Sequence, residues 1–182
     1  MDEESEIMTI IETLLEKNVD NIPLNILVFG PNPEGQFDEQ RINDLKKKRL
    51  EIAEYLRAKG HNVIFPENMI APNSPPIDKA DIPLMEMALM KEYDLIVNLV
   101  DTPGTNAEAT MIMMKPDFAR KSTMFICDEH RGGLVYGVCK LANTMGADLT
   151  EYKYPSDLVE CHLLTKIAEK VRAIQIAAFL SN

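Results

Sequence analysis

The 182-residue sequence lacks the features of exported, membrane-spanning and disulfide-stabilised proteins. Its longest apolar runs, such as LIVNLV at 95–100, are far shorter than the roughly 20 residues that cross a bilayer. The N-terminus reads MDEESE, which is acidic where a signal peptide would be basic. The three cysteines are an odd number without metal-like spacing, which argues against a disulfide framework. We therefore expect a cytoplasmic protein that has no membrane partner and binds no metal.

Positive charge is also scarce. The formal net charge is −10, and affinity for nucleic acids depends mainly on neutralising phosphates with lysine and arginine. The densest basic run, Lys46–Arg49, lies within a helical pattern and is interpreted as a solvated helix face. We therefore expect no nucleic-acid polymer as a partner, whereas a free nucleotide needs only a few well-placed groups.

The glycine motifs of the common nucleotide-binding folds are missing too. The first predicted strand ends at Gly30-Pro31-Asn32-Pro33, with neither the G-x-G-x-x-G pattern nor a Gly-Lys-Ser/Thr ending. This argues against a nicotinamide dehydrogenase and a P-loop NTPase, and we expect no cofactor. Glycine at the end of a strand often allows close approach of the backbone to a ligand. Gly30, Pro31 and Asn32 are therefore candidate substrate-binding residues.

Strand and helix patterns alternate along the chain. Short apolar runs predict strands at 25–30, 61–66, 94–100, 122–127 and 148–152. Helical spacing of apolar residues predicts helices at 4–17, 38–59, 81–93, 131–146 and 156–180. A further helix is predicted to follow the loop DTPGT at 101–105 and to end at Met114. Unbroken apolar strands between helices indicate a parallel sheet covered on both faces. We predict an α/β fold: a three-layer, doubly wound, five-stranded flavodoxin-like or Rossmann-like domain in residues 21–182, preceded by an N-terminal helical appendage in residues 1–20.

Ligands of such sheets bind beyond the carboxyl ends of the strands. That rule selects four loops: 30–37, 66–80, 101–108 and 128–133. In the third of these, Gly104 leaves room for a ligand and Thr105 is predicted to cap the following helix. Free amides at the start of that helix favour an anion or a hydroxyl group. Glu108 falls in its first turn, where it either serves the ligand or only completes the capping arrangement.

The loop after the fourth strand reads Asp128-Glu129-His130-Arg131-Gly132-Gly133. Arg131 and the two glycines at a helix start are suited to holding a phosphate through a charge-assisted contact and backbone amides. An ordinary surface loop with a glycine-rich helix start is the alternative interpretation.

The pattern resembles the nucleoside 2-deoxyribosyltransferase family over about residues 25–127. The shared features are an apolar strand ending Gly30-Pro31, a long helix, and Ala58–Val63 leading to Pro66. They continue with Tyr93–Val97 and end with Gly104-Thr105-x-x-Glu108. The last motif is the most specific, whereas the others occur in many flavodoxin-like proteins.

The resemblance implies a reaction and a set of residues. Glu108 matches the family's nucleophile, which attacks the anomeric carbon of a 2′-deoxyribonucleoside, releases the base and holds the sugar until a second base or water takes it. Glu86 matches an acidic residue that binds the base or passes it a proton. Asp101 lies near the family's sugar-hydroxyl-binding acid. Family members also form homo-oligomers in which a neighbouring subunit completes the pocket.

The sequence departs from the family at the first strand, where a tyrosine usually orients the nucleophile. Leu27, Val28 and Phe29 stand there, and none of them can donate a hydrogen bond. Three functions remain open. The first is N-glycosidic transfer or hydrolysis on a nucleoside, or on a nucleoside monophosphate held by Arg131. The second is a nucleotide sensor without turnover, and the third is an interaction protein with helical ends.

Overall fold

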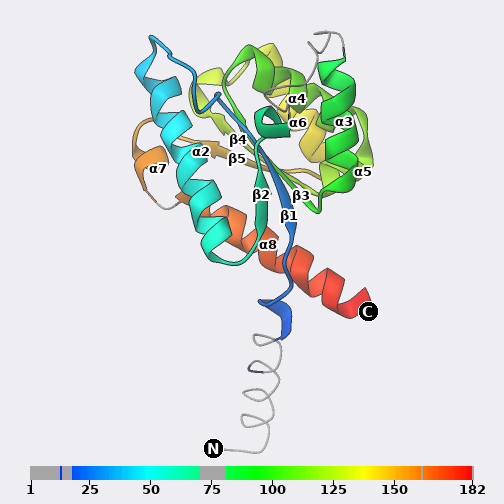
Figure 1. The fold of residues 1–182 in the computed structure, drawn as a ribbon. Coiled ribbons are helices and arrows are strands. Elements are labelled where there is room, and N and C mark those ends of the chain that lie inside the picture. Colours follow the sequence, from blue (N-terminus) through cyan, green and yellow to red (C-terminus); the bar gives the residue numbers. More distant parts are fainter. Residues whose placement is uncertain (1–12, 14–17, 70–80, 161, 182) are drawn as a thin grey trace, which may run out of the picture.

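A computed structural model describes residues 13, 18–69, 81–160 and 162–181 of the chain. The described residues form a five-stranded, fully parallel sheet with helices on both faces (Figure 1). The strands are β1 (Asn25–Phe29), β2 (Asn62–Ile64), β3 (Leu95–Val100), β4 (Ser122–Cys127) and β5 (Asp148–Tyr152). Their order across the sheet is β2-β1-β3-β4-β5, which is the flavodoxin-like order. The predicted fold class is therefore confirmed.

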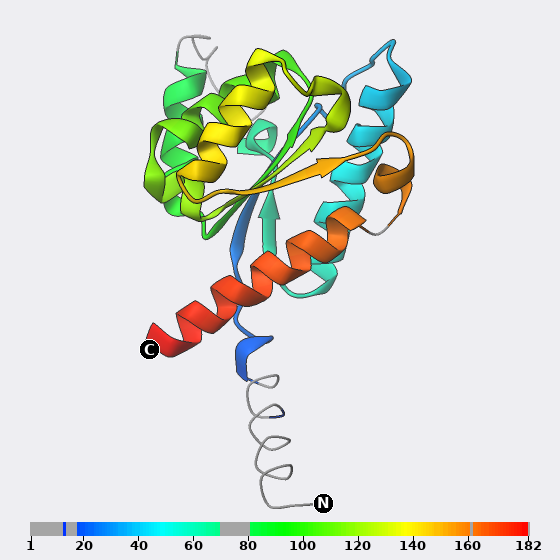
Figure 2. The same ribbon diagram turned by 180° about the vertical axis from the view of Figure 1, so that it is seen from behind.

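Two helical layers cover the sheet, as Figures 1 and 2 show from opposite sides. The helices are α2 (Gln40–Ala58), α3 (Ile82–Glu92), α4 (Pro103–Met114), α5 (Pro116–Arg120), α6 (Leu134–Thr144), α7 (Ser156–Val159) and α8 (His162–Ser181), with 3-10 turns η1 (Pro66–Met69) and η2 (Asp128–His130). Helices α2, α7 and α8 pack on one face and α3 to α6 on the other. Within the described residues, no helix combines the length and apolar character needed to span a bilayer.

Alternation along the strands divides the core between the two faces. In β1, Ile26 and Val28 pack with α2 and α8, whereas Leu27 and Phe29 pack with the layer of α3 to α6. Successive side chains of a strand point to opposite faces, so a strand buried on both sides must be apolar throughout. This explains why the predicted strands coincide closely with the observed ones.

The helices differ from the predictions in three places. Residues 116–120, between the fourth predicted helix and the fourth strand, form the separate short helix α5. The helix predicted over 156–180 is two helices, because α7 ends at Val159. The helix start predicted at Asp38 lies at Glu39, which makes no side-chain capping bond.

The basic run at Lys46–Arg49 is not a fully solvated face, and that interpretation is wrong. Lys48 and Arg49 are buried, and Arg49 is only 1% exposed. The helix predicted at 4–17 lies outside the described residues except at position 13, and most of the 66–80 loop also lies outside them.

The point where the strand order reverses lies between β1 and β3. From β1 the chain passes outward to β2 and then returns to β3 on the other side. The connections after β1 and β3 therefore diverge and leave a crevice at the carboxyl edge. A ligand site is therefore expected at the loops after these two strands.

Candidate functional site

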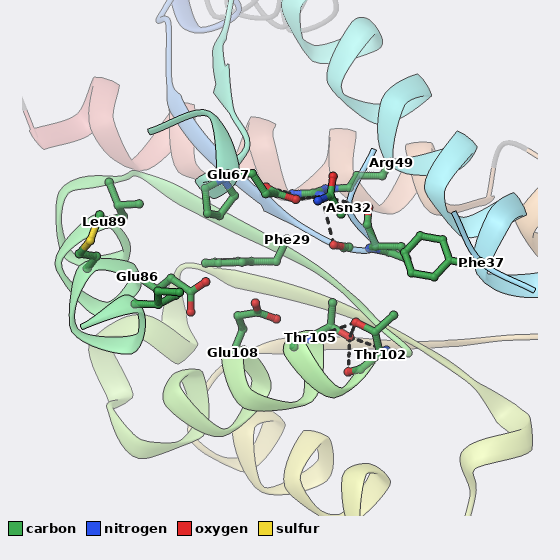
Figure 3. Close-up of a pocket in the computed structure, with 16 residues that line it drawn as sticks. Phe29, Asn32, Phe37, Arg49, Glu67, Glu86, Leu89, Thr102, Thr105 and Glu108 are labelled. Carbon is green, nitrogen blue, oxygen red and sulfur yellow. Dashed lines mark hydrogen bonds and ion pairs between the residues drawn. The ribbon is translucent and has the colours of Figure 1, made fainter. Parts of the chain in front are cut away.

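A cavity of about 500 Å³ lies at this switch point, which is a size typical of small-molecule sites. Its walls come from the end of β1 and the following loop, from η1, from α3 and from the first turns of α4 (Figure 3). Seven of the nine predicted site residues line it: Gly30, Pro31, Asn32, Glu86, Gly104, Thr105 and Glu108. The structure therefore brings together residues from three separate segments of the chain.

The start of α4 is held by a reciprocal pair of threonines. Thr102, not Thr105 as predicted, is the N-cap, and its hydroxyl accepts a hydrogen bond from the amide of Thr105. The hydroxyl of Thr105 in turn accepts a bond of 2.8 Å from the amide of Thr102. Each side chain thus satisfies a backbone donor at the helix start. Because the threonines complete the cap, the alternative that Glu108 serves only as a capping residue loses its basis.

A buried amide fixes α4 to the centre of the sheet. Asn98 lies in the middle of β3, is fully buried, and donates to the carbonyl oxygen of Thr105 at 3.1 Å. A buried polar group is stable only when it is hydrogen-bonded, so the strand and the helix start hold each other in register. The helix then places Glu108 one turn beyond this anchor, facing the cavity (Figure 3).

Glu108 is the most perturbed carboxyl group of the site. It is 9% exposed, and its Oε2 atom is buried without a hydrogen-bond partner among the described residues. Burial, followed by repulsion from Glu86, raises the pKa of Glu108 to about 8, although Arg49 acts in the opposite direction. At neutral pH the carboxyl group of Glu108 is therefore mostly protonated when no positive charge is bound beside it.

Glu86 lies across the cavity on α3, and its carboxylate is directed toward that of Glu108 (Figure 3). It is half-buried, and burial together with the charge of Glu67 raises its pKa. Two carboxyl groups that share one cavity disfavour each other's ionisation. One of the two carboxyl groups can therefore keep its proton near neutral pH and exchange it with a bound substrate, which is what general acid–base catalysis requires.

Arg49, which is not among the predicted site residues, reaches the cavity from α2 across the end of β1. Its guanidinium donates to both carboxylate oxygens of Glu67, at 2.5 and 2.9 Å. It also donates to three main-chain oxygens at the end of β1: Val28 (2.6 Å), Gly30 (3.1 Å) and Pro31 (3.0 Å). The guanidinium lies 4.4 Å from the ring centre of Phe65. Arg49 thus ties α2, β1 and η1 together beneath the cavity.

This arginine explains the glycine at the end of β1. A Cβ atom at position 30 would lie 2.7 Å from Cδ of Arg49, which is closer than real contacts allow. Gly30 therefore gives passage to a side chain of the protein itself, whereas the sequence analysis assigned this space to a ligand. A Cβ at position 104 would meet Oε1 of Glu108 at 3.8 Å and Oγ1 of Thr102 at 3.9 Å, which are ordinary contact distances. No contact in the described structure requires glycine there.

The remaining walls of the cavity are largely apolar. Phe29 lies between the Arg49–Glu67 pair and Glu108, and Phe37 lies at the opposite end from Glu86 (Figure 3). Other apolar lining residues include Ile82, Met85 and Leu89 of α3. Aromatic and aliphatic walls with a few polar groups are typical of sites for planar, partly apolar ligands.

Asp101 does not line this cavity. Its side chain is fully buried, with Oδ1 2.7 Å from Nε2 of His130 and Oδ2 2.9 Å from Nε of Arg41. Alternation along β3 gives the reason. Leu99 packs against the α2 side of the sheet, so Asp101, two residues later, points to that side and meets Arg41 of α2. The cavity lies on the side of α3 and α4.

Arg131 does not line the cavity either. Its Nε donates to Glu151 of β5 at 2.7 Å, and the arginine is exposed. Tyr136 donates to the same carboxylate. Strands β3 and β4 separate β5 from β1 in the sheet, so Arg131 belongs to the opposite end of the carboxyl edge. Its neighbour His130 contacts Asp101 instead.

Two signals in the sequence could have revealed the missed residues. Arg49 continues the apolar stripe of α2, falling four residues after Leu45 and three before Ile52, so the helical repeat places it on the buried face. Glu67 directly follows the second predicted strand, at 61–66, and lies in one of the four loops in which the strand-end rule predicts a ligand site. Among the described residues, no group of three or more histidine, cysteine or acidic side chains could hold a metal ion.

Comparison with known proteins supports the fold. No protein-family model matches the chain. No curated protein matches it either. A solved structure, that of a conserved protein from Enterococcus faecalis V583, is similar at 14% sequence identity with a TM-score of 0.50, covering 84% of this chain and 99% of that chain. At this identity the similarity concerns the fold alone, a parallel sheet with helices on both sides.

Proposed function

We propose that the cavity binds a nucleoside-like small molecule and that Glu108 cleaves its N-glycosidic bond. One observation carries the proposal. Two carboxyl groups from different helices, Glu86 and Glu108, line one cavity of about 500 Å³, and Oε2 of Glu108 is buried there with no hydrogen-bond partner in the described part of the chain. Paired carboxyl groups on either side of a sugar are the usual machinery for glycosidic cleavage, because the transition state is an oxocarbenium ion.

The two groups take different roles in the proposed reaction. Ionised Glu108 attacks the anomeric carbon, and the electrons of the C1′–N bond pass to the base, which leaves after Glu86 gives it a proton. Water or a second base then displaces the sugar from Glu108. The largely apolar walls, including Phe29 and Leu89, suit a planar base and exclude water from the reacting atoms.

The protonation of Glu108 makes the proposal testable by pH. A nucleophile must be ionised, and burial with repulsion from Glu86 holds the pKa of Glu108 at about 8. With a glycoside whose leaving group needs no proton from Glu86, release should therefore increase roughly tenfold per pH unit from pH 6 and level off above about pH 8, because only the ionisation of Glu108 then limits the rate. A rate that stays constant from pH 6 to 8 with such a glycoside would show that the assignment of Glu108 as the nucleophile is wrong.

The direct experiment is chromatography of free bases after incubation with a mixture of deoxynucleosides and deoxynucleotides. We expect release by the wild type and at least about a thousandfold loss in Glu108→Gln, which preserves the shape but removes the nucleophile. Glu129→Gln is the matched control, because Glu129 pairs with Arg41 outside the cavity. If these compounds raise the melting temperature but none of them yields free base, the protein binds nucleotides without turnover, and the proposed enzymatic function is wrong.

The proposal includes a homo-oligomer. Large apolar side chains are exposed on the layer of α3 to α6: Leu84 at 67%, Met114 at 66% and Leu134 at 86%. Side chains of this kind favour protein–protein contact where they form a contiguous patch. Sedimentation equilibrium tests this part, and Leu84→Lys should shift the protein toward monomer.

A further inference from the structure

We infer that the cavity selects N-glycosides whose base carries a positive charge and whose sugar carries no phosphate. This inference rests on the proposed N-glycosidic reaction and names the substrate class of the same site. It follows from the balance of charges around the cavity, from the bonds of its cation, and from the aromatic side chains in its walls.

Arg49, the one cation among the described residues that line the cavity, has no accessible donor for a ligand phosphate. Two of its guanidinium nitrogens are bonded to Glu67 and to main-chain oxygens of β1 and its loop, and the third, Nε, makes no hydrogen bond among the described residues but is buried. The side chain is 1% exposed. A phosphate would have to displace Glu67 or remain unpaired among carboxylates, and both outcomes oppose binding.

Among the described residues, Glu86 and Glu108 have no such cationic partner. Arg49 balances the charge of Glu67, so the charge that Glu86 carries, and the charge that Glu108 gains when it releases its proton, have no counter-charge there. Glu108 lines this space, and its Oε2 atom is buried with no hydrogen bond among the described residues. A positively charged ligand supplies the missing counter-charge, and in a partly desolvated cavity this attraction is stronger than in water.

The aromatic lining favours the same ligand. Phe29 and Phe37 border the cavity, and the faces of aromatic rings attract cations, while a planar base also gains apolar contact with them. A cationic heteroaromatic base, such as an N-linked pyridinium, meets both requirements at once.

A cationic base also simplifies the reaction. When the C1′–N⁺ bond breaks, both its electrons go to nitrogen, and the base leaves neutral without needing a proton. An oxygen of Glu108 forms the new bond to C1′. Water then attacks C1′, the sugar leaves Glu108 with the water's hydroxyl group, and the remaining proton passes to Glu86 or to solvent. The sum is hydrolysis of the glycoside to base, free sugar and one proton.

Ligand charge is tested with three probes: 1-(2-deoxyribosyl)pyridinium, its 5′-phosphate, and the neutral isostere deoxyribosylbenzene. Titration calorimetry should show the pyridinium binding about tenfold more tightly than the isostere, and the phosphate about tenfold more weakly than the pyridinium. Repeating the pyridinium titration at pH 7 in buffers of different ionisation enthalpy should show release of close to one proton, because the pKa of Glu108 is about 8 in the empty cavity.

Variants assign the effect to the cavity. Glu86→Gln should reduce the preference for the pyridinium over the isostere to about twofold or less. Glu129→Gln lies outside the cavity and should keep the wild-type preference. Equal binding of the charged and neutral probes, no binding of either, or tighter binding of the phosphate would overturn the inference.

The two proposals can fail separately. Cleavage of neutral deoxynucleosides without preference for the cationic probe would leave the proposed function standing and reject the selection for charge. Tight pyridinium binding with no free base from any probe would support the charge selection at this site and reject catalysis. Because binding and base release are measured independently, each result bears on one claim.

Discussion

Two groups of charged side chains lie at the carboxyl edge of the same sheet and are built in opposite ways. In the cavity, Glu108 is buried and faces another acid, Glu86, and one of its oxygens has no hydrogen-bond partner among the residues that the structure describes. On the α2 side, Asp101 is buried more completely but lies between His130 and Arg41. Burial between an arginine and a hydrogen-bonding histidine fixes a loop in place. Burial among like charges leaves a group that is stabilised only by a proton or a ligand, and that condition marks the binding site.

The largest effect on this comparison should come from Arg49→Met, which removes the one cation among the described residues that line the cavity. The variant strands three carbonyl oxygens and the carboxylate of Glu67, so we expect a loss of about 3–5 kcal/mol in the free energy of unfolding. Urea denaturation measures it. Arg131→Met is the matched control: Arg131 is exposed and forms a surface pair, so its midpoint should stay close to wild type. An unchanged midpoint for Arg49→Met would contradict the role of Arg49 as a structural tie.

A smaller effect should appear in the pH dependence of stability. Glu108 has a pKa of about 8 in the folded protein, above its ordinary value of 4.5. The stability it contributes is complete below about pH 4.5 and is lost as the pH rises through 8. Between pH 5 and 9 the free energy of unfolding of the wild type should therefore fall relative to that of Glu108→Gln, by about 2–5 kcal/mol. Parallel curves would show that Glu108 is not perturbed.

The smallest effect is expected on the paired side of the comparison. Asp101→Asn keeps the size of the side chain but removes the charge between His130 and Arg41, which should cost about 1–3 kcal/mol in the free energy of unfolding. Binding at the cavity should change by less than about twofold, because Asp101 lies on the other side of β3. A large loss of ligand affinity would mean that Asp101 acts on the ligand after all.

The sequence predicted the fold well because both faces of the sheet are covered. A strand such as β3 must then be an unbroken apolar run, and that signal survives without any knowledge of the neighbours. Short elements carry less signal. Helix α5 has only five residues, and the break between α7 and α8 falls inside a continuous helical pattern.

The site was harder to predict, because the loops that form it do not reveal which side chains converge. The rule that ligands bind beyond the carboxyl ends of the strands identified the edge of the sheet at which the cavity lies. The side chains of Asp101 and Arg131 nevertheless lie at other parts of that edge, outside the cavity. For Asp101, the two-residue alternation of β3 contains the answer, since it shares the side of Leu99. For Arg49, no local pattern shows that the guanidinium crosses the end of β1, although its position on the buried stripe of α2 shows that it cannot be solvated.

The passage of Arg49 over Gly30 links two positions that lie 19 residues apart. Any side chain at position 30 would collide with this arginine, so homologous proteins that keep the arginine must keep the glycine. A lineage that replaces the arginine with a short residue removes the collision, and position 30 can then vary. We therefore expect the two positions to co-vary during evolution, and larger residues at position 30 to mark homologues in which the floor of the cavity is held by different contacts.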